Sequence, residues 1–419
     1  MPKKIAFHHF GCKVNFSEAS ALARQFRERG YELTGYREQA DIYVINTCAV
    51  TREAEKKCIY AIRQTHRLNP EAKIVVMGCF SELNPEEIRS IEGVTLVLGQ
   101  SDKFRLFDLL EDSEPATSPA ACDFVPSYSM GDRTRSFLKI QDGCDYYCAY
   151  CTIPLARGHS RSDTIANVVR EARDIAAAGV REIVLTGVNI GEFGRHQQET
   201  FLDLLIRLEQ EVDIPRIRFS SIEPNLLSDE IIRLVASSRK IMPHFHIPLQ
   251  SGSDKTLRAM HRKYDTALYA GRISTIRSLL PYACIAADVI VGFPGETDAD
   301  FDDAYRFMEG LDISYLHVFS YSRRDHTRAA AMEDQVPGHI IHLRSEELHR
   351  LSETKKHRFY EQNRGRREEA LLESTNVDGM MHGFTGNYIK VKHPFDPGLT
   401  NQIVPVILDR PDDDMTFII

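Results

Sequence analysis

The sequence lacks long apolar runs, tryptophan and any excess of basic side chains. No segment approaches the ~20 apolar residues that span a bilayer, and the first residues, Met-Pro-Lys-Lys, lead into a strand-like segment instead of a signal sequence. The 52 Lys and Arg are outnumbered by 60 Asp and Glu, which argues against a protein that coats nucleic acid through its overall charge. We therefore expect a cytoplasmic protein without a membrane part, in which any RNA contact comes from local basic patches.

The chain is long and contains nine cysteines. At 419 residues it exceeds the ~250 to 300 residues at which single cores stop growing, so two or three domains are expected. The cytoplasm keeps thiols reduced, and nine cysteines there are not expected to form a disulfide framework. Metal ligation or catalysis is the better interpretation, and a multidomain enzyme is the starting hypothesis.

The first third of the chain alternates short apolar runs with helical periodicity. Strands are expected at 4–10, 41–46, 73–77 and 94–98, and helices at 17–29, 51–68 and 84–91. Strands separated by helices predict an open parallel α/β sheet, here over residues 1–112. A stretch rich in Pro, Ser and acidic residues follows, and we interpret residues 113–133 as a linker.

The alternation resumes in residues 134–354. Strands are expected at 137–141, 182–188, 216–222, 244–249, 285–291 and 316–321, and helices at 164–178, 201–212 and 267–280. Six strand–helix units are fewer than the eight that close a complete barrel. The pattern therefore predicts an α/β domain in the form of a partial, open (β/α)6 barrel.

The pattern changes again in the last part of the chain. A long polar helix is expected to run from about 338 to 362, and strands are expected at 370–375, 379–392, 403–408 and 415–419. In the second of these strands, Tyr388 and Lys390 alternate with Ile389 and Val391, which gives one polar and one apolar face. Residues 355–419 are therefore expected to form a small antiparallel β-barrel appended to the enzyme.

One loop, Gly143-Cys144-Asp-Tyr-Tyr-Cys148-Ala-Tyr-Cys151, carries three thiols directly after a predicted strand. This spacing lets a loop wrap three thiolates around one corner of a four-iron four-sulfur cluster, although thiolates also bind zinc. Closed zinc sites need four protein ligands, whereas this loop offers three. Three ligands leave one iron open to a substrate amino acid such as methionine. The alternatives are a zinc site completed by a residue such as His159, or unconnected buried thiols.

A second set of thiols is separated in sequence but shares a position relative to the predicted strands. Cys12, Cys48 and Cys79 each follow one of the first three strands. The carboxyl ends of strands in an open parallel sheet share one crevice, so these thiols should converge into another three-ligand cluster site. The alternative is three packed cysteines, because free cysteine is often buried. Cys58, Cys122 and Cys284 have no comparable setting and are interpreted as bystanders.

These motifs resemble those of a known family. The loop with Cys144, Cys148 and Cys151 resembles the radical S-adenosylmethionine (SAM) signature, and its continuation Thr152-Ile-Pro-Leu-Ala-Arg157-Gly158-His-Ser160-Arg161-Ser is similar to that of the methylthiotransferases. Gly11-Cys12-Lys-Val-Asn15, Asn46-Thr-Cys48 and Gly78-Cys79 resemble the three cysteine motifs of that family's N-terminal domain. The resemblance covers essentially the whole chain and includes a terminal β-barrel similar to the RNA-binding TRAM domain.

The resemblance implies two four-iron four-sulfur clusters. The cluster on Cys144, Cys148 and Cys151 would bind SAM and cleave it reductively to a 5′-deoxyadenosyl radical. The auxiliary cluster on Cys12, Cys48 and Cys79 would carry a sulfur that a first SAM methylates. The radical would remove hydrogen from carbon two of an adenine, which then receives the methylthio group. A tRNA substrate and an electron donor such as flavodoxin or ferredoxin are the implied partners.

Two short motifs indicate the branch of the family. Gly-Cys-Lys-Val-Asn near the start and Leu185-Thr-Gly-Val-Asn-Ile190-Gly resemble the branch that acts on threonylcarbamoyl-adenosine in tRNA. The isopentenyl-adenosine branch tends to carry Gln-Met-Asn and Gly-Gln-Asn at those places, and a third branch modifies an aspartate of a ribosomal protein. Those two branches and, more distantly, a zinc-binding scaffold protein are the alternatives.

The resemblance also implies SAM contacts at the strand ends of the barrel, although the usual Gly-Gly-Glu motif is absent. The candidates are Thr186, Asn189, Ser221, Glu223, Gln250, Arg262 and Asp288. Thr186 and Asn189 lie where enzymes of this class usually bind the ammonium group, and Asp288, with Gly292-Phe-Pro-Gly295-Glu296, resembles a motif that packs against the adenine. Structural caps and turns are the alternative role for each.

Two basic clusters are candidates for binding RNA. They are Lys355, Lys356, Arg358, Arg364, Arg366 and Arg367 near the terminal domain, and Arg323, Arg324 and Arg328 after the last barrel strand. Such clusters on an acidic protein could contact phosphates, and a solvated helix end is the alternative for the first. Phe384 or Tyr388 could stack on bases, whereas the acidic run at 412–414 would repel RNA.

Overall fold

The computed structural model describes residues 2–111, 123–131, 134–412 and 414–419. The N-terminal domain is a five-stranded sheet in the order β2-β1-β3-β4-β5, all parallel within the described residues. Its elements are β1 (Lys4–His9), α1 (Lys13–Glu28), β2 (Glu32–Thr34), β3 (Ile42–Thr47), α2 (Arg52–Leu68), β4 (Lys73–Gly78), α3 (Cys79–Leu83), α4 (Pro85–Arg89), β5 (Val94–Leu98) and α5 (Leu106–Leu110). This confirms the expected open parallel sheet.

Two details of this domain differ from the expectation. Helix α1 begins at Lys13, four residues earlier than expected, because Cys12 already occupies its N-cap position in extended conformation. The edge strand β2 has only three residues, which is too short for its periodicity to be recognised. The predicted linker at 113–133 falls largely on residues outside the described ranges, and so does Cys122. Within it, β6 (Ser127–Tyr128) is described and pairs with the barrel strand β7.

The central domain is the expected partial barrel. Its six parallel strands in the described chain are β7 (Ser136–Lys139), β10 (Glu182–Thr186), β11 (Arg216–Phe219), β12 (His244–His246), β13 (Cys284–Val291) and β14 (Tyr315–Ser320). Strand β7 pairs with β10 and β10 with β11, whereas β12, β13 and β14 form a second run. A single bridge between Ile217 and Ile241 joins the two runs. Strands β7 and β14 do not pair with each other in the described chain, so the barrel is open between them.

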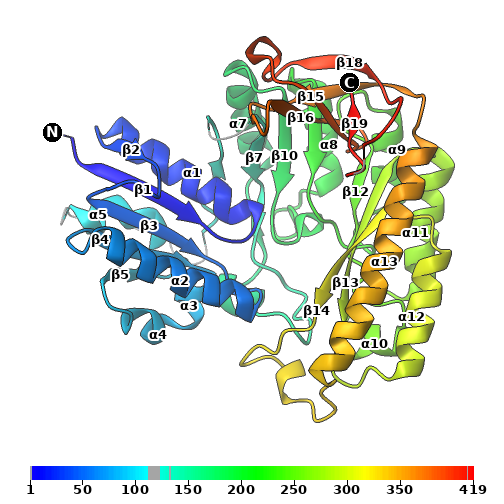
Figure 1. Cartoon of the computed structure of the whole chain (residues 1–419), viewed down its shortest axis with the longest axis horizontal. Helices are drawn as coiled ribbons and strands as arrows, with labels where there is room; N and C mark the ends of the chain where they lie inside the picture. Colours follow the sequence, from blue (N-terminus) through cyan, green and yellow to red (C-terminus); the bar gives the residue numbers. More distant parts are fainter. Residues whose placement is uncertain (1, 112–122, 132–133, 413) are drawn as a thin grey trace.

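Helices cover the outside of this barrel (Figure 1). They are α7 (Ile165–Ala177), α8 (Phe201–Glu211), α9 (Asp229–Ser237), α10 (Asp254–Ala259), α11 (Thr266–Leu279), α12 (Asp298–Gly310) and α13 (Gly338–Gln362). Side-chain caps set their starts: the Thr164 hydroxyl accepts from the Asn167 backbone, and Thr297 and Asp300 form a reciprocal capping box. Apolar side chains of the helices and strands form one continuous core.

The C-terminal part forms a curled sheet in the order β18-β15-β16-β17-β19. Its strands are β15 (Arg367–Leu372), β16 (Met380–Thr385), β17 (Lys390–Pro394), β18 (Ile403–Ile407) and β19 (Phe417–Ile418). The prediction of one strand over 379–392 is wrong, because the chain turns at Gly386 and Asn387 and Tyr388 has a φ of 64°. The sheet is also not wholly antiparallel, since β17 and β19 pair in parallel.

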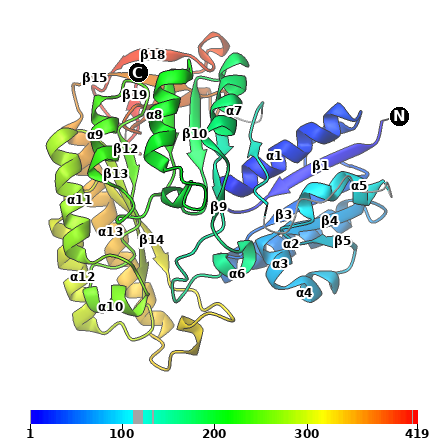
Figure 2. The ribbon, with the colours of Figure 1, turned by 180° about the vertical axis from the view of Figure 1, so that it is seen from behind.

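The N-terminal domain lies across the open side of the barrel (Figures 1 and 2). Helix α1 packs against β6 and β7 at one edge of the opening. At the other edge, the buried Arg324, shortly after β14, pairs with Glu55 of α2, and the Ser322 hydroxyl accepts from the Arg52 backbone. The strand ends that carry the first three cysteines therefore face the barrel.

A buried group of charges joins these two domains. Glu18 of α1 forms ion pairs with Lys103 at 2.7 Å, with Lys139 of β7 at 3.0 Å and with Arg157 at 3.3 Å. Arg157 also pairs with Asp142 at 2.8 Å, and all five side chains are almost completely buried. Burial alone would raise the pKa of Glu18, but the three cations hold it below its usual range. Three cations thus face two carboxylates in the interior.

Replacement of Glu18 by Gln should lower the free energy of unfolding by about 3 to 5 kcal/mol, because it leaves buried cations without their carboxylate. Urea unfolding of the full chain at neutral pH measures this change. The matched control is Glu111→Gln, which removes a carboxylate that pairs with Lys3 at the surface, and it should leave stability nearly unchanged. Equal stability of the two variants would contradict the role given to Glu18.

Candidate active site

Cys12, Cys48 and Cys79 lie at the carboxyl ends of the neighbouring strands β1, β3 and β4. Two glycines allow the chain to pass close by them. Gly11 has a φ of 92°, and a Cβ there would lie 2.8 Å from the Cys48 Sγ. Gly78 has a φ of 108°, and a Cβ there would overlap Asn46 and the backbone of Thr47. The Gly-Cys pairs thus bring the backbone against the neighbouring strand end at positions where only glycine fits.

Cys48 and Cys79 are buried, whereas Cys12 is exposed, and a guanidinium lies beside Cys79. Burial raises the pKa of Cys48 to about 12 and also raises that of Cys79, so both thiols are neutral until a metal ion displaces their protons. The Arg157 Nε donates to the Cys79 Sγ at 3.3 Å, and its Nη2 donates to the Asn15 Oδ1 at 2.5 Å. The buried charge group has one more cation than carboxylates, and its member Arg157 lies beside Cys79. Thiolates at this site would therefore balance the excess positive charge.

Cys144, Cys148 and Cys151 lie in the loop after β8 (Gln141–Asp142), directly before α6 (Ile153–Arg157). Gly143 has a φ of 70°, and any side chain there would overlap the backbone carbonyl of His159. The Cys144 backbone donates to the Gly158 carbonyl at 3.1 Å, which closes the loop. Burial raises the pKa of Cys144 and of Cys151 to about 12. These thiols are therefore neutral as well without a bound metal.

Several of the expected SAM contacts surround this loop. The Arg262 Nη1 donates to the Cys148 Sγ at 2.9 Å, and the same guanidinium pairs with Glu223. The Asn189 amide lies 4.0 Å from the Cys144 Sγ, and its buried Oδ1 has no hydrogen-bond partner among the described residues. Thr186 is buried at the end of β10 beside this loop. An unpaired acceptor at this place fits a site for a ligand with donor groups.

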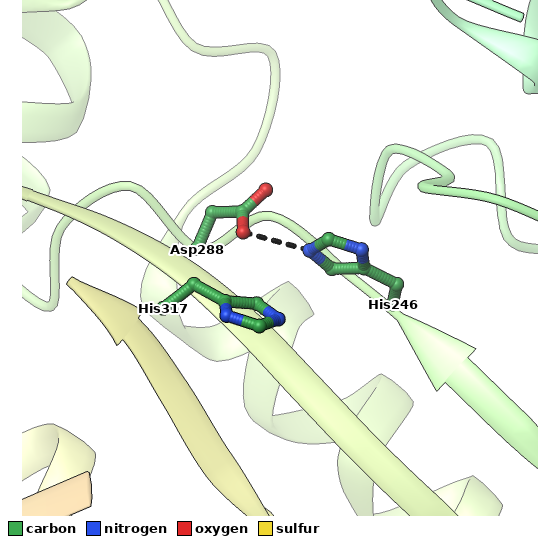
Figure 3. Close-up of side chains that lie close together, drawn as sticks. All are labelled: His246, Asp288 and His317. Atoms are coloured by element: carbon green, nitrogen blue, oxygen red, sulfur yellow. Dashed lines mark hydrogen bonds and ion pairs between the residues drawn. The ribbon is translucent and has the colours of Figure 1, made fainter. Parts of the chain in front are cut away.

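Gln250 and Asp288 line a second part of the barrel mouth. They border a cavity of about 240 Å³ together with Val50 and Tyr150, which follow or precede predicted cluster ligands. Inside the barrel, the His246 Nε2 lies 2.7 Å from the Asp288 Oδ1, and His317 lies beside them (Figure 3). Ser221 is half-buried after β11. The assignment of these residues to SAM stays a prediction.

The spacing of the cysteines bears on the zinc alternative. Tetrahedral zinc with Zn–S bonds of about 2.3 Å places its sulfurs about 3.8 Å apart. Among the residues that the structure describes, the one group of three possible ligand atoms within 4.8 Å of one another is that of His246, Asp288 and His317. Neither cysteine set is that compact, although the charges of its members act on one another. The separation of the thiols therefore does not favour a preformed zinc site.

The basic candidates for RNA binding divide into buried and exposed residues. Arg324 is occupied by Glu55, as described above, and the buried Lys355 donates to the carbonyls of Glu309 and Leu311 at the end of α12. Arg366 lies over the ring of Tyr282 at 3.7 Å. Arg323, Arg328, Arg358, Arg364 and Arg367 are exposed, and Lys356 is half-buried. The exposed members keep their predicted role as a possible phosphate-binding set.

Phe384 and Tyr388 do not face solvent as a stacking platform would. Tyr388 stacks on His244 of β12 with ring centroids 4.5 Å apart, and Phe384 stacks on Tyr388 at 4.7 Å. The side chain of Arg135 lies over Phe384 at 4.9 Å. These aromatic side chains join the terminal sheet to the barrel. The sequence could not place Tyr388, because its ring partner His244 is distant in the chain.

Two family models match separate parts of the chain. Residues 4–99 match an uncharacterized protein family, UPF0004, and residues 138–308 match the radical SAM superfamily. The threonylcarbamoyladenosine tRNA methylthiotransferase of Bacillus subtilis is 39% identical and covers 96% of this chain and 93% of its own length. The corresponding enzyme of Aquifex aeolicus is 35% identical over 93% of this chain and 96% of its own length.

The chain is also similar to an enzyme named for dimethylallyladenosine and to a solved radical SAM structure. The tRNA-2-methylthio-N6-dimethylallyladenosine synthase of Endomicrobium trichonymphae is 34% identical over 78% of each chain. A radical SAM methyltransferase from Kitasatospora setae, solved with cobalamin and a [4Fe-4S] cluster, superposes with a TM-score of 0.56 at 15% identity, covering 78% of this chain and 77% of its own. That likeness shows a shared fold.

The partial barrel, its three-cysteine loop and the superfamily match define a radical SAM enzyme. The chain belongs to the radical SAM methylthiotransferase family, in which its full-length curated relatives are threonylcarbamoyladenosine tRNA methylthiotransferases. This confirms the family expected from the cysteine motifs. The cofactors of the family are SAM and [4Fe-4S] clusters. No helix in the described part of the chain has the length and apolar character needed to cross a membrane.

The sequence predicted no role for Arg157, although this residue lies in the methylthiotransferase-like motif that follows the cysteine loop. The structure places its guanidinium between Cys79 and the loop of the other three cysteines. No local pattern distinguishes it, because its partners Cys79 and Glu18 are 78 and 139 residues away. The only signal was its position at the end of the cysteine loop motif.

The close approach at Gly11 generates a test of the first cysteine site. Gly11→Ala should reduce iron bound after anaerobic reconstitution from about eight towards about four atoms per chain, because the new Cβ displaces Cys48. Gly30→Ala is the matched control, since Gly30 also has a positive φ but open space around it, and it should keep full iron. Full iron content in the Gly11 variant would show that iron binding at the first cysteine site does not depend on the position of Cys48.

Proposed function

We propose that this chain adds a methylthio group to carbon two of threonylcarbamoyl-adenosine, next to the anticodon of tRNA. The observation that carries this proposal is the near-complete match to curated enzymes of that name, at up to 39% identity. The dimethylallyladenosine-type relative is matched over a smaller share of the chain. The ribosomal-protein branch and the zinc-scaffold alternative are not favoured.

We assign the six converging cysteines as the ligands of two [4Fe-4S] clusters. The glycine-limited backbone, the placement of buried and half-buried thiols beside the exposed Cys12, and the adjacent guanidiniums support three thiolates around each cluster. When bound, the clusters and SAM supply electron transfer, radical formation and sulfur chemistry that no side chain can provide. An aromatic carbon–hydrogen bond offers no acidic proton to a base, so the side chains act by binding and positioning.

The protein's own groups stabilise and separate the two sites. Arg157 would stabilise the negative charge on Cys79, and Arg262 would do so on Cys148, through the hydrogen bonds that both already make. The Arg157 guanidinium is fixed by Glu18, Asp142 and Asn15, so the auxiliary site is held at a constant place relative to the SAM loop. The N-terminal domain across the barrel opening would exclude water and competing reductants.

The proposed function also needs residues that bind SAM and tRNA. Asn189, with its unpaired Oδ1, and the Arg262–Glu223 pair would bind the polar groups of SAM, with Thr186, Ser221, Gln250 and Asp288 nearby. The curled C-terminal sheet would serve as a TRAM-like domain, and the exposed basic residues would contact tRNA phosphates. The enzyme would act in the cytoplasm with an electron donor such as flavodoxin or ferredoxin.

Substitution of single cysteines separates the two proposed roles. Cys148→Ala should abolish SAM cleavage, whereas Cys48→Ala should retain cleavage and lose thiolation, because each would remove a ligand from a different cluster. Cys284→Ala, which removes a buried thiol at the start of β13 and outside both sets, is the control and should retain both activities. 5′-Deoxyadenosine and methylthio-nucleoside are measured by mass spectrometry. Thiolation by the Cys48 variant would contradict the auxiliary assignment.

The substrate branch is tested in cells. Deletion of the gene should eliminate methylthio-threonylcarbamoyl-adenosine from tRNA and leave threonylcarbamoyl-adenosine in its place. Nucleoside mass spectrometry of total tRNA measures both, and expression of the wild-type chain should restore the methylthio form. An unchanged level in the deletion strain would overturn the proposed substrate.

A further inference from the structure

A cavity of about 190 Å³ lies directly beside Cys12, at the junction of all three parts of the protein. The N-terminal domain contributes Cys12 and Lys13, the barrel contributes Arg218 and His244, and the terminal sheet contributes Tyr388. The volume corresponds to about six water molecules, which suits a group of amino-acid size. No role assigned above uses this cavity.

Lys13 differs from the other cations of this cavity. Arg218 donates to Glu182 at 2.9 Å and to the Gly386 and Thr385 carbonyls, so its guanidinium is fully used. Arg135 donates to Glu373 at 2.7 Å. Among the described residues, Lys13 has no hydrogen-bond or ion-pair partner, and its side chain remains accessible. Partial burial and the charges of Arg135 and Arg218 lower the pKa of Lys13, so an anionic partner would favour its charged form. The cavity thus contains one amino group without an anionic hydrogen-bond partner among the described residues.

The charge balance around Lys13 favours an anionic ligand. Glu182 and Glu373 balance the charges of Arg135 and Arg218, whereas no carboxylate in the described part of the chain lines the cavity beside Lys13. The charge of Asp288 acts on Lys13, but no ion pair joins the two among the described residues, and the Asp288 Oδ1 lies 2.7 Å from the His246 Nε2 (Figure 3). A carboxylate from outside would be the missing counter-charge for Lys13.

We infer that Lys13 binds the carboxylate of the threonylcarbamoyl group of the substrate nucleoside. This inference rests on the proposed function, because the threonine part of the substituent on the adenine N6 of that substrate ends in a free carboxylate. Only two ring atoms separate that position from carbon two, the atom that receives sulfur. A group that binds the N6 substituent must therefore lie close to the auxiliary cluster, and Lys13 directly follows the ligand Cys12.

The test compares two anticodon stem-loop RNAs with the full-length, cluster-loaded enzyme. One RNA carries threonylcarbamoyl-adenosine, and the other carries the same nucleoside with its carboxylate converted to the neutral carboxamide. The wild-type protein should bind the acid about tenfold or more tightly than the amide, since a hydrogen bond between charged groups is worth about that factor. Equilibrium binding is measured by fluorescence anisotropy, and methylthiolation of both RNAs is followed in parallel.

Three variants locate the effect. Lys13→Met should bind the acid as weakly as the wild type binds the amide and should not discriminate between them, whereas Lys13→Arg should retain most of the preference. Lys73→Met is the matched control, because Lys73 is an exposed lysine at the opposite end of the sheet, and it should retain the full preference. Iron content of each variant is measured to compare equally loaded proteins.

The outcomes separate this inference from the proposed function. Equal binding and conversion of acid and amide by the wild type, or a preference that persists in Lys13→Met, would overturn the role of Lys13 and leave the substrate assignment intact. A loss of affinity of the same size for both RNAs in Lys13→Met would show that the lysine binds a phosphate and would overturn it as well. Failure of the wild type to convert either RNA would instead overturn the proposed function.

Discussion

The buried charges around Arg157 are the interaction on which the arrangement of the two cysteine sites depends. One guanidinium contacts Cys79 and Asn15 of the N-terminal domain and Asp142 of the barrel, while Glu18 holds it from the opposite side. Two clusters that act on one adenine need a fixed separation, and packed apolar surfaces alone could slide. Ion pairs with defined geometry fix this separation, and their desolvation is tolerated because every charge has partners.

The same constraint explains why the barrel is left open. A complete barrel would fill its interior with side chains, whereas the gap between β7 and β14 gives the N-terminal domain access to the inner face. Contacts at both edges of the gap, through α1 and through the Arg324–Glu55 pair, hold the N-terminal domain against the barrel. The active site thereby becomes a cavity between domains whose walls come from segments far apart in the sequence.

Local features of the sequence predicted most strands and helices and the position of the cysteines at strand ends, because strand periodicity and Gly-Cys motifs are carried by neighbouring residues. The parts that could not be predicted depend on distant partners. Arg324 looked like an RNA contact but pairs with Glu55, and Lys355 looked like part of a basic strip but binds the carbonyls at the end of α12. The sequence does not distinguish a lysine that contacts a phosphate from one that donates to a carbonyl 44 residues away, as Lys355 does.

Tyr388 illustrates how a local error changes a functional interpretation. Its alternation with Ile389 suggested the exposed face of a strand, but the turn at Gly386 and Asn387 gives it a positive φ and directs its ring onto His244. The terminal sheet therefore contributes to the wall of the cavity beside Cys12, and not only to an outer surface for RNA. Because the sheet, the barrel and the N-terminal domain all border this cavity, a tRNA held by the terminal sheet would be held by a domain that also shapes the pocket for its modified base.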